Sequence, residues 1–179
     1  MSGNTAPQAC LPLISEGYCR LNAELHKTSA HYGTSGRRYS QQVYDLALAM
    51  QTQDILDYGC GKSTLAAKLP FEIKQYDPAV EKFSAPPSPA DLVVCTDVLE
   101  HVEPERLAAV LGHLETLVKR VGFFVIATRP AKKTLGDGRN AHLIIEDAKW
   151  WLDVLWDRFK VTRFENLGGS FLVIAGAKN

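Results

Sequence analysis

From residue 54 onward, short apolar runs alternate with stretches of helical periodicity, and this alternation constrains the fold more than any other feature of the sequence. Short continuous apolar runs are typical of strands that are covered on both faces, as in parallel sheets. The stretches between them carry apolar residues at helical spacing. The pattern therefore predicts an open, doubly wound α/β sheet. The expected strands are residues 55–58, 71–76, 92–95, 123–127, 161–164 and 171–175, and the expected helices are 43–50, 105–119 and 146–159.

The last two apolar runs predict an antiparallel pair of strands. Only a few residues around Gly168 and Gly169 separate them, which is too short for a crossover helix. The sheet is therefore expected to be mostly parallel, with an antiparallel last strand.

Residues 1–38 fit the alternation least well. They contain several prolines and glycines and one helix-like stretch, at about residues 15–26. We expect residues 1–38 to form a lid or cap that belongs to the same domain as residues 39–179. Disorder at the extreme N-terminus is equally compatible with the sequence.

Composition and charge exclude several classes of protein. Hydrophobic residues at 46% and charged residues at 22% are typical of a globular chain and not of a disordered one. No apolar run approaches the roughly 18 residues of a membrane-spanning helix, and no secretory signal is visible. Twenty basic and twenty acidic residues argue against non-specific binding to nucleic acid. The four cysteines form no metal or disulfide pattern, so we expect a reduced, cytoplasmic domain whose oligomeric state the sequence leaves open.

The segment from Asp57 to Ser63 follows the first expected strand and precedes a helical pattern. Glycines at such a turn allow a ligand to approach the backbone near a helix N-terminus. One candidate is a nucleotide triphosphate loop, because residues 61–63 match the end of G-x-x-x-x-G-K-[ST]. However, Leu56 occupies the place of the first glycine, and Asp57 would put a carboxylate where phosphate should bind. A P-loop NTPase is therefore disfavoured.

The second candidate is a sulfonium nucleoside. Residues 57–61 resemble the D-x-G-C-G signature of class I S-adenosylmethionine-dependent methyltransferases. Asp77 ends the second expected strand, where an acidic residue accepts both ribose hydroxyls. Residues 91–102 are similar to the fourth-strand motif of these enzymes, including its E-H-V ending. The resemblance implies a Rossmann-like, seven-stranded sheet with the last strand inserted antiparallel. The candidate cofactor-binding residues are Asp57, Gly59, Cys60, Gly61, Asp77, Asp97 and Arg38, the last as a partner of the methionine carboxylate.

The sequence departs from the family pattern in two places. Ser63 stands where a third glycine is usual. Only 13 residues separate Asp77 from Asp91, too few for a full helix and the third strand. We therefore expect a shortened third-strand region, with no counterpart of the acidic residue that often contacts adenine.

The segment after the third apolar run contains the candidate catalytic residues. Asp97, Glu100 and His101, with His142 further on, resemble the E-x-x-E-H…H metal site of small-RNA 3′-end 2′-O-methyltransferases and ubiquinone-pathway O-methyltransferases. That resemblance implies that these four residues hold Mg²⁺, Mn²⁺ or Zn²⁺. The favoured alternative has no metal. In it His101 acts as the general base because an unperturbed imidazole titrates near neutrality, and Asp97 and His142 complete the catalytic set.

Charge is distributed unevenly along the chain. Residues 91–115 are mostly acidic, whereas residues 119–139 are mostly basic. The basic segment favours an anionic acceptor, although a solvated basic loop has the same composition. We expect methyl transfer to an oxygen of a small or nucleotide-sized, possibly anionic substrate. The alternatives are metal-assisted 2′-O-methylation of an RNA end and a non-catalytic S-adenosylmethionine-binding protein.

Overall fold

The computed structural model describes residues 12–178 and contains a six-stranded sheet in the order β2-β1-β3-β4-β6-β5. The first four strands of this order are parallel to one another. This arrangement confirms the predicted doubly wound, mostly parallel sheet. The strands are β1 (Ile55–Tyr58), β2 (Lys74–Tyr76), β3 (Ala90–Thr96), β4 (Val118–Ala127), β5 (Phe159–Asn166) and β6 (Ser170–Ala177).

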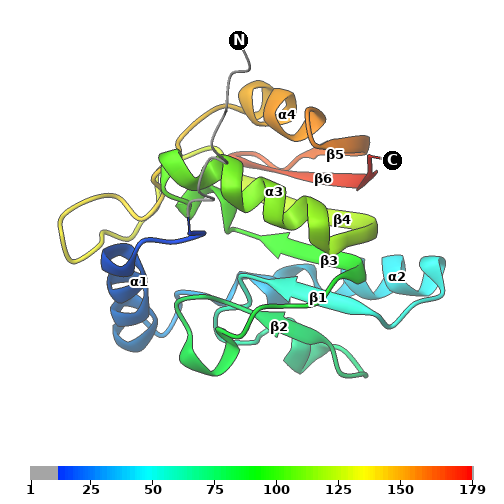
Figure 1. Cartoon of the computed structure of the whole chain (residues 1–179), viewed down its shortest axis with the longest axis horizontal. Coiled ribbons are helices and arrows are strands. Elements are labelled where there is room, and N and C mark those ends of the chain that lie inside the picture. Colours follow the sequence, from blue (N-terminus) through cyan, green and yellow to red (C-terminus); the bar gives the residue numbers. More distant parts are fainter. Residues whose placement is uncertain (1–11, 179) are drawn as a thin grey trace, which may run out of the picture.

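Helices cover both faces of the sheet and bury its apolar residues in two layers (Figure 1). One layer lies between the sheet and α3 (Leu107–Leu117) with α4 (Ala148–Trp156), and it contains the fully buried Trp151. The other lies between the sheet and α2 (Ser40–Met50). Strands such as β3 are buried on both faces, which explains why they appear as continuous apolar runs in the sequence.

Strand β6 is antiparallel to both of its neighbours, β4 and β5. The turn between β5 and β6 contains Gly168 and Gly169, whose φ angles are 71° and 94°. Backbone with positive φ favours glycine because it has no Cβ. The predicted antiparallel insertion of the last strand is confirmed.

Two expectations about the first half of the sheet are wrong. The described residues form six strands and not seven, because the connection from β2 to β3 contains only the single 3₁₀ turn Glu81–Phe83. The shortened third-strand region is thereby confirmed. The helix expected after the glycine loop is also absent in this part of the chain, where one 3₁₀ turn, Ala66–Lys68, precedes Pro70.

Helix α1 (Glu16–Thr28) lies at the carboxyl ends of the parallel strands, beside the long connection from β4 to α4 (Figure 1). Tyr18 of α1 packs with Leu135 and Ala141 of that connection in a small separate core. Ser15 caps α1 and also donates from its hydroxyl to Glu103 Oε1 at 2.6 Å. These contacts fix α1 over the end of the sheet.

Cys19, Cys60 and Cys95 are free thiols, and Cys10 lies outside the described residues. Within residues 12–178, none of the helices has the length and apolar character needed to cross a bilayer.

Candidate functional site

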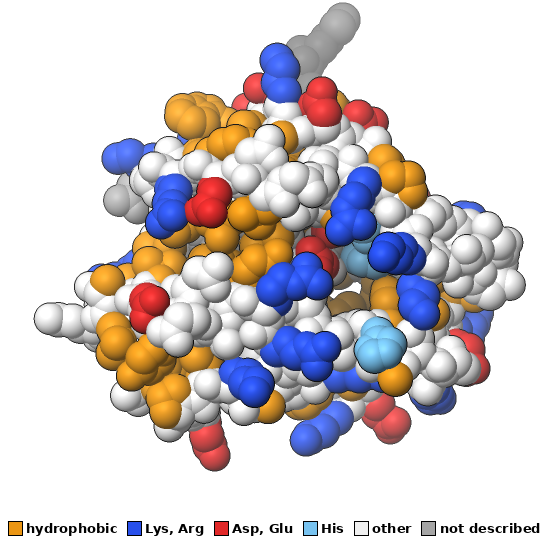
Figure 2. Space-filling model, turned by 180° about the vertical axis from the view of Figure 1, so that it is seen from behind, with side chains coloured by type: hydrophobic (Ala, Val, Ile, Leu, Met, Phe, Trp, Pro, Cys, Tyr) orange, Lys and Arg blue, Asp and Glu red, His pale blue; other side chains and the backbone are white. Residues whose placement is uncertain are grey.

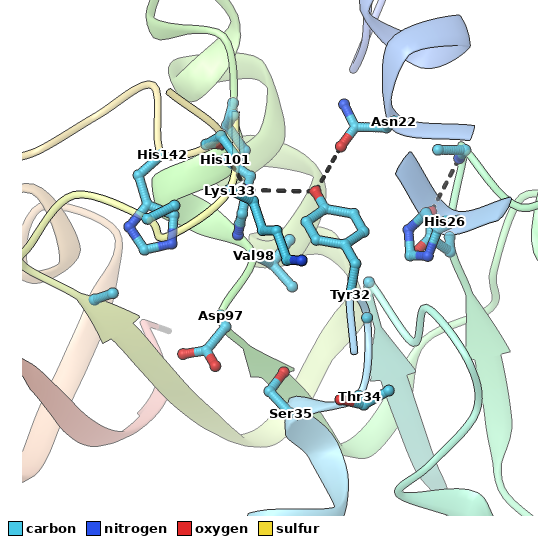
Figure 3. A pocket seen from close by; sticks show the side chains of 18 of the residues that line it. Asn22, His26, Tyr32, Thr34, Ser35, Asp97, Val98, His101, Lys133 and His142 are labelled. Carbon is cyan, nitrogen blue, oxygen red and sulfur yellow. Dashed lines mark hydrogen bonds and ion pairs between the residues drawn. The ribbon is translucent and has the colours of Figure 1, made fainter. Parts of the chain in front are cut away.

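A cavity of about 560 Å³ opens at the carboxyl ends of β1, β3 and β4, under α1 (Figure 3). Its volume lies within the usual range of small-molecule and cofactor sites. The predicted site residues that line it are Arg38, Gly59, Asp77, Asp97, His101 and His142. Those that are buried outside the cavity lining are Asp57, Cys60, Gly61 and Glu100.

The glycine loop brings three segments of the chain together. Gly59 has a φ of 76°, and a Cβ at this position would collide with the side chain of Val98, which follows β3. Gly61 has a φ of 51°, and its Cβ would lie 2.6 Å from the carbonyl oxygen of Gly33. That same oxygen accepts a hydrogen bond from Lys62 N at 2.8 Å. The two glycines are therefore required for close packing of the protein itself, besides any approach of a ligand.

Asp77 lies at the end of β2 with its carboxylate held by backbone donors. Its Oδ2 accepts from Gly61 N at 3.0 Å, and its Oδ1 accepts from Ala79 N at 2.9 Å. The residue is buried, at 7% exposure, but lines the cavity. Gly61 thus reaches the cavity indirectly, by orienting Asp77.

Asp57 lies on β1 and is almost completely buried. Burial, and secondarily the nearby charge of Asp77, raise the pKa of Asp57 to about 7. This carboxyl group therefore exchanges its proton close to neutral pH.

Asp97 directly follows β3 and has a φ of 53°, a left-handed conformation that is uncommon outside glycine. Strained backbone of this kind is often found at functional sites. Burial raises the pKa of Asp97, although Arg38, His142 and Arg129 act in the opposite direction. Its carboxylate therefore lies near three basic groups that come from different parts of the chain.

Glu100 is fully buried next to the cavity. Its Oε1 accepts from Ala127 N at 2.9 Å, whereas its Oε2 has no hydrogen-bond partner among the described residues. Burial, together with the charge of Asp97, raises the pKa of Glu100 to about 8. An unpartnered buried carboxylate oxygen is costly, so it requires an explanation.

His101 and His142 lie with their rings 4.7 Å apart, and the Nδ1 atom of each faces a backbone carbonyl. His101 Nδ1 lies 2.7 Å from Ala141 O, and His142 Nδ1 lies 2.6 Å from Arg129 O. Each carbonyl requires a proton on Nδ1, so in the neutral form of each ring Nε2 carries the lone pair. Burial lowers the pKa of His101 to about 3, far below the unperturbed, near-neutral value on which its choice as general base rested.

Backbone hydrogen bonds bring His142 to the end of β3. Leu143 N and Ile144 N both donate to Glu100 O, at 2.8 and 3.0 Å. As a result, ligand atoms of Glu100, His101 and His142 all lie within 4.8 Å of one another. The structure brings together three of the four residues of the predicted metal set, and Asp97 stands outside this group.

Comparison with known proteins identifies the family. The profile of a methyltransferase domain family matches residues 23–167 of the chain. The chain belongs to this methyltransferase family. It is a class I S-adenosylmethionine-dependent methyltransferase, as the sequence resemblance implied. No curated protein matches the sequence.

Solved structures of similar fold include three methyltransferases. The 1,6-didemethyltoxoflavin-N1-methyltransferase of Burkholderia thailandensis is 14% identical, with a TM-score of 0.66, over 94% of this chain and 93% of that one. The N-methyltransferase NodS of Bradyrhizobium japonicum is 13% identical, with a TM-score of 0.60, over 90% and 100% of the two chains. The magnesium protoporphyrin IX methyltransferase of Synechocystis is 16% identical, with a TM-score of 0.57, over 92% and 95%. All three contain S-adenosylhomocysteine, and their acceptors differ.

The cofactor of this methyltransferase fits the cavity at the glycine-loop end. A carboxylate has about four acceptor positions, and the two backbone donors on Asp77 leave some of them available for ribose hydroxyls. His26 Nε2 lies 3.9 Å from Asp77 Oδ2 at the same end. The chemistry of these groups matches a nucleoside.

Sequence reasoning missed part of the cavity wall of the methyltransferase. Tyr18, Asn22 and His26 of α1 all line the cavity. Tyr32 donates from its hydroxyl to Asn22 Oδ1 at 2.7 Å, and this hydroxyl also lies 3.4 Å from His101 Nδ1 (Figure 3). The spacing of these three α1 residues could have indicated that they face the same way, because residues four apart share one face of a helix.

The mouth of the methyltransferase cavity is rich in basic side chains. Figure 2 shows Lys and Arg side chains gathered around a hollow, with histidine beside it. None of the five lysine and arginine residues that line the cavity forms an ion pair with a described residue. They are Arg37, Arg38, Arg129, Lys132 and Lys133.

Proposed function

We propose that this methyltransferase transfers a methyl group from S-adenosylmethionine to an oxygen atom of a small or nucleotide-sized anionic acceptor. One observation carries the proposal: a single cavity has a hydrogen-bonded carboxylate at one end and two histidines with free Nε2 atoms at the other (Figure 3). The carboxylate end suits a nucleoside, and the histidine end suits removal of a proton from an acceptor.

At the cofactor end, we assign the ribose hydroxyls to Asp77 and the methionine carboxylate to Arg38. Gly59 lines this end directly, and Gly61 acts through its hydrogen bond to Asp77. The other two sequence-based candidates, Asp57 and Cys60, support the loop from behind the cavity wall. We also propose that residues 12–38 act as a lid within the same domain as residues 39–178; the rest of the segment 1–38 expected to form the lid lies outside the described residues.

At the acceptor end, we assign the role of proton acceptor to His142, with Asp97 and His101 as the other members of the catalytic set. The methyl group moves in line, so the bond from carbon to the acceptor oxygen forms as the bond to sulfur breaks. The acceptor proton passes to Nε2 of His142, and the nearby carboxylate of Asp97 stabilises the resulting imidazolium. Burial makes His101 a weak base, so it positions the acceptor.

The test is methyl transfer from labelled S-adenosylmethionine to a panel of hydroxyl, carboxyl and amine acceptors, with each product identified by mass spectrometry. We expect an O-methylated product. His142→Gln should lower kcat by about 100-fold and leave the affinity for S-adenosylhomocysteine unchanged. An N-methylated product would overturn the assignment of oxygen. Tight cofactor binding with no turnover on any acceptor would favour the non-catalytic binding protein instead.

A divalent metal at Glu100, His101 and His142 is a second candidate, because Glu100 Oε2 is buried without a partner and both histidines are oriented by backbone carbonyls. Carbonyl partners on the second ring nitrogen are typical of histidines that bind metals. One carboxylate and two imidazoles suit Zn²⁺ or Mn²⁺, and a bound ion lowers the pKa of an acceptor hydroxyl. In this alternative the histidines are ligands and not bases.

The reaction that this alternative favours is metal-assisted 2′-O-methylation, with an RNA end as the substrate. It requires activity that EDTA removes and Mn²⁺ or Zn²⁺ restores. It also requires RNA binding that weakens steeply with salt. Full activity after EDTA treatment would exclude the metal.

A further inference from the structure

Arg129 stands at the end of β4 with its side chain packed over the turn between β5 and β6. It lines the cavity and forms no ion pair with a described residue. A Cβ at Gly169 would lie 2.9 Å from Cδ and 3.0 Å from Nε of Arg129. Gly169 therefore leaves the space in which the arginine side chain lies.

The backbone around Arg129 is also fixed. Its carbonyl oxygen accepts from His142 Nδ1 at 2.6 Å, and the preceding Thr128 N donates to Gly169 O at 3.1 Å. Since both ends of the dipeptide are hydrogen-bonded, the guanidinium extends from a rigid base. A rigid base lowers the entropy cost of binding a ligand.

The two cavity arginines that flank Asp97 belong to different ends of the cavity. Arg38 follows Arg37, whose N donates to Thr64 Oγ1 at 3.3 Å, so it stands beside the glycine-loop segment. Arg129 stands beside His142 at the acceptor end. By contrast, several arginines elsewhere on the surface are already paired with carboxylates. They are Arg106, Arg120, Arg139, Arg158 and Arg163.

We infer that Arg129 binds the anionic group of the acceptor, that this group is a phosphate-type oxyanion, and that Gly169 is the positioning residue that keeps the arginine in place. The inference rests on the proposed function, because it takes the acceptor to lie beside His142. An arginine fork matches two oxygens of a phosphate. Lys132 and Lys133 line the same cavity, whose lining holds five lysine and arginine residues against three acidic ones, Asp77, Asp97 and Glu103. This excess of positive charge is balanced better by a phosphate dianion than by a single carboxylate.

The turn offers a matched control for Gly169. Gly168 has a φ of 71°, also in the left-handed region, but a Cβ there would meet nothing within 4 Å. Alanine at either position therefore introduces backbone strain, and only Gly169→Ala displaces Arg129. Comparison of the two variants separates the position of the arginine from the stability of the turn.

The experiment titrates inorganic phosphate into the full chain saturated with S-adenosylhomocysteine, at constant ionic strength. A parallel titration with sodium acetate measures the affinity for a carboxylate. We expect saturable phosphate binding that is at least fivefold tighter than acetate binding. Gly169→Ala should weaken phosphate binding at least fivefold, and Gly168→Ala should not. Arg129→Gln, at an exposed position, should weaken phosphate binding at least as much as Gly169→Ala does, and Gly169→Ala should not weaken the remaining phosphate binding further in the Arg129→Gln background.

Three results would overturn the inference. The first is no saturable phosphate binding by the unaltered protein, and the second is equal phosphate affinity of the two alanine variants. The third is a loss of S-adenosylhomocysteine affinity in Arg129→Gln, which would assign this arginine to the methionine carboxylate. Failure of the unaltered protein to bind S-adenosylhomocysteine would instead contradict the proposed function.

Discussion

A buried carboxyl group lies at each end of the cavity, Asp77 in its wall and Glu100 behind its wall, and the two differ in how their oxygens are satisfied. Asp77 has a backbone donor on each oxygen and faces the cavity. Glu100 is more deeply buried, with a donor on Oε1 and no partner for Oε2. The first is oriented by the protein alone. The second has an oxygen without a hydrogen-bond partner in a place where desolvation is costly, which is typical of a group that acts on something else.

The two ends also differ in how the chain builds them. The cofactor end depends on residues 57–61 and Asp77, which neighbouring parallel strands bring together. The acceptor end depends on Glu100 and on His142, which belongs to the connection after the next strand. The following predictions test whether the two ends act independently, from the largest expected effect to the smallest.

Asp77→Ala should have the largest effect. It removes the proposed ribose acceptor and leaves Gly61 N and Ala79 N without their partner. We expect the affinity for S-adenosylhomocysteine to fall about 100-fold, or about 2.7 kcal/mol, by isothermal titration calorimetry. The control is Asp54→Asn, which removes surface ion pairs with Lys74 and Lys119. A loss of less than threefold in Asp77→Ala would place the ribose elsewhere.

Asp57→Asn should change how stability depends on pH. The folded-state pKa of about 7 lies above the ordinary value of 3.8, so the folded state holds the proton more tightly than the unfolded state does. This stabilisation is present at low pH and is lost as the pH rises towards 7. Between pH 5 and 7 the group should lower the free energy of unfolding by about 2 kcal/mol.

Urea unfolding at several pH values measures this effect. Asp57→Asn should make the profile less steep, with the remaining slope supplied by Glu100. The control Asp54→Asn should not, because ion pairs lower the pKa of Asp54 and it stays ionised over this range. Parallel pH profiles for Asp57→Asn and the unaltered protein would contradict the raised pKa.

Glu100→Gln tests the acceptor end alone. The amide oxygen of glutamine can still accept from Ala127 N, but the side chain can no longer ionise to bind a cation. We expect Mn²⁺ or Zn²⁺ affinity to fall at least tenfold, or about 1.4 kcal/mol, with the affinity for S-adenosylhomocysteine unchanged. If cofactor affinity falls equally, the two ends are not independent.

Ser63→Gly should have the smallest effect. Ser63 has a φ of 60°, the conformation in which glycine is usual, and its hydroxyl accepts from Gln75 Nε2. Glycine relieves the backbone strain but loses this hydrogen bond, so the change in unfolding free energy should stay below about 1 kcal/mol. Thermal unfolding and cofactor titration measure both quantities. A larger loss of stability would show that the serine side chain stabilises the turn.

Most elements of the fold could be predicted because their signals are local. The helix expected at residues 105–119 forms as Leu107–Leu117, and the strand expected at 123–127 extends over Val118–Ala127. The helix expected after the glycine loop does not form, and positive φ angles at Gly61 and Ser63 show that the backbone is not helical there. The number of strands differs from the family pattern because the connection from β2 to β3 is short.

The sequence by itself determined the order of the elements, the glycine loop and the acidic residue at the end of β2, because each depends on residues close together in the chain. Only the tertiary structure decided that Glu100 meets His142, that Arg129 lies over Gly169, and that His101 is a weak base. These properties depend on burial and on distances between remote segments. Both are set by how the layers pack, and a sequence pattern carries no measure of either.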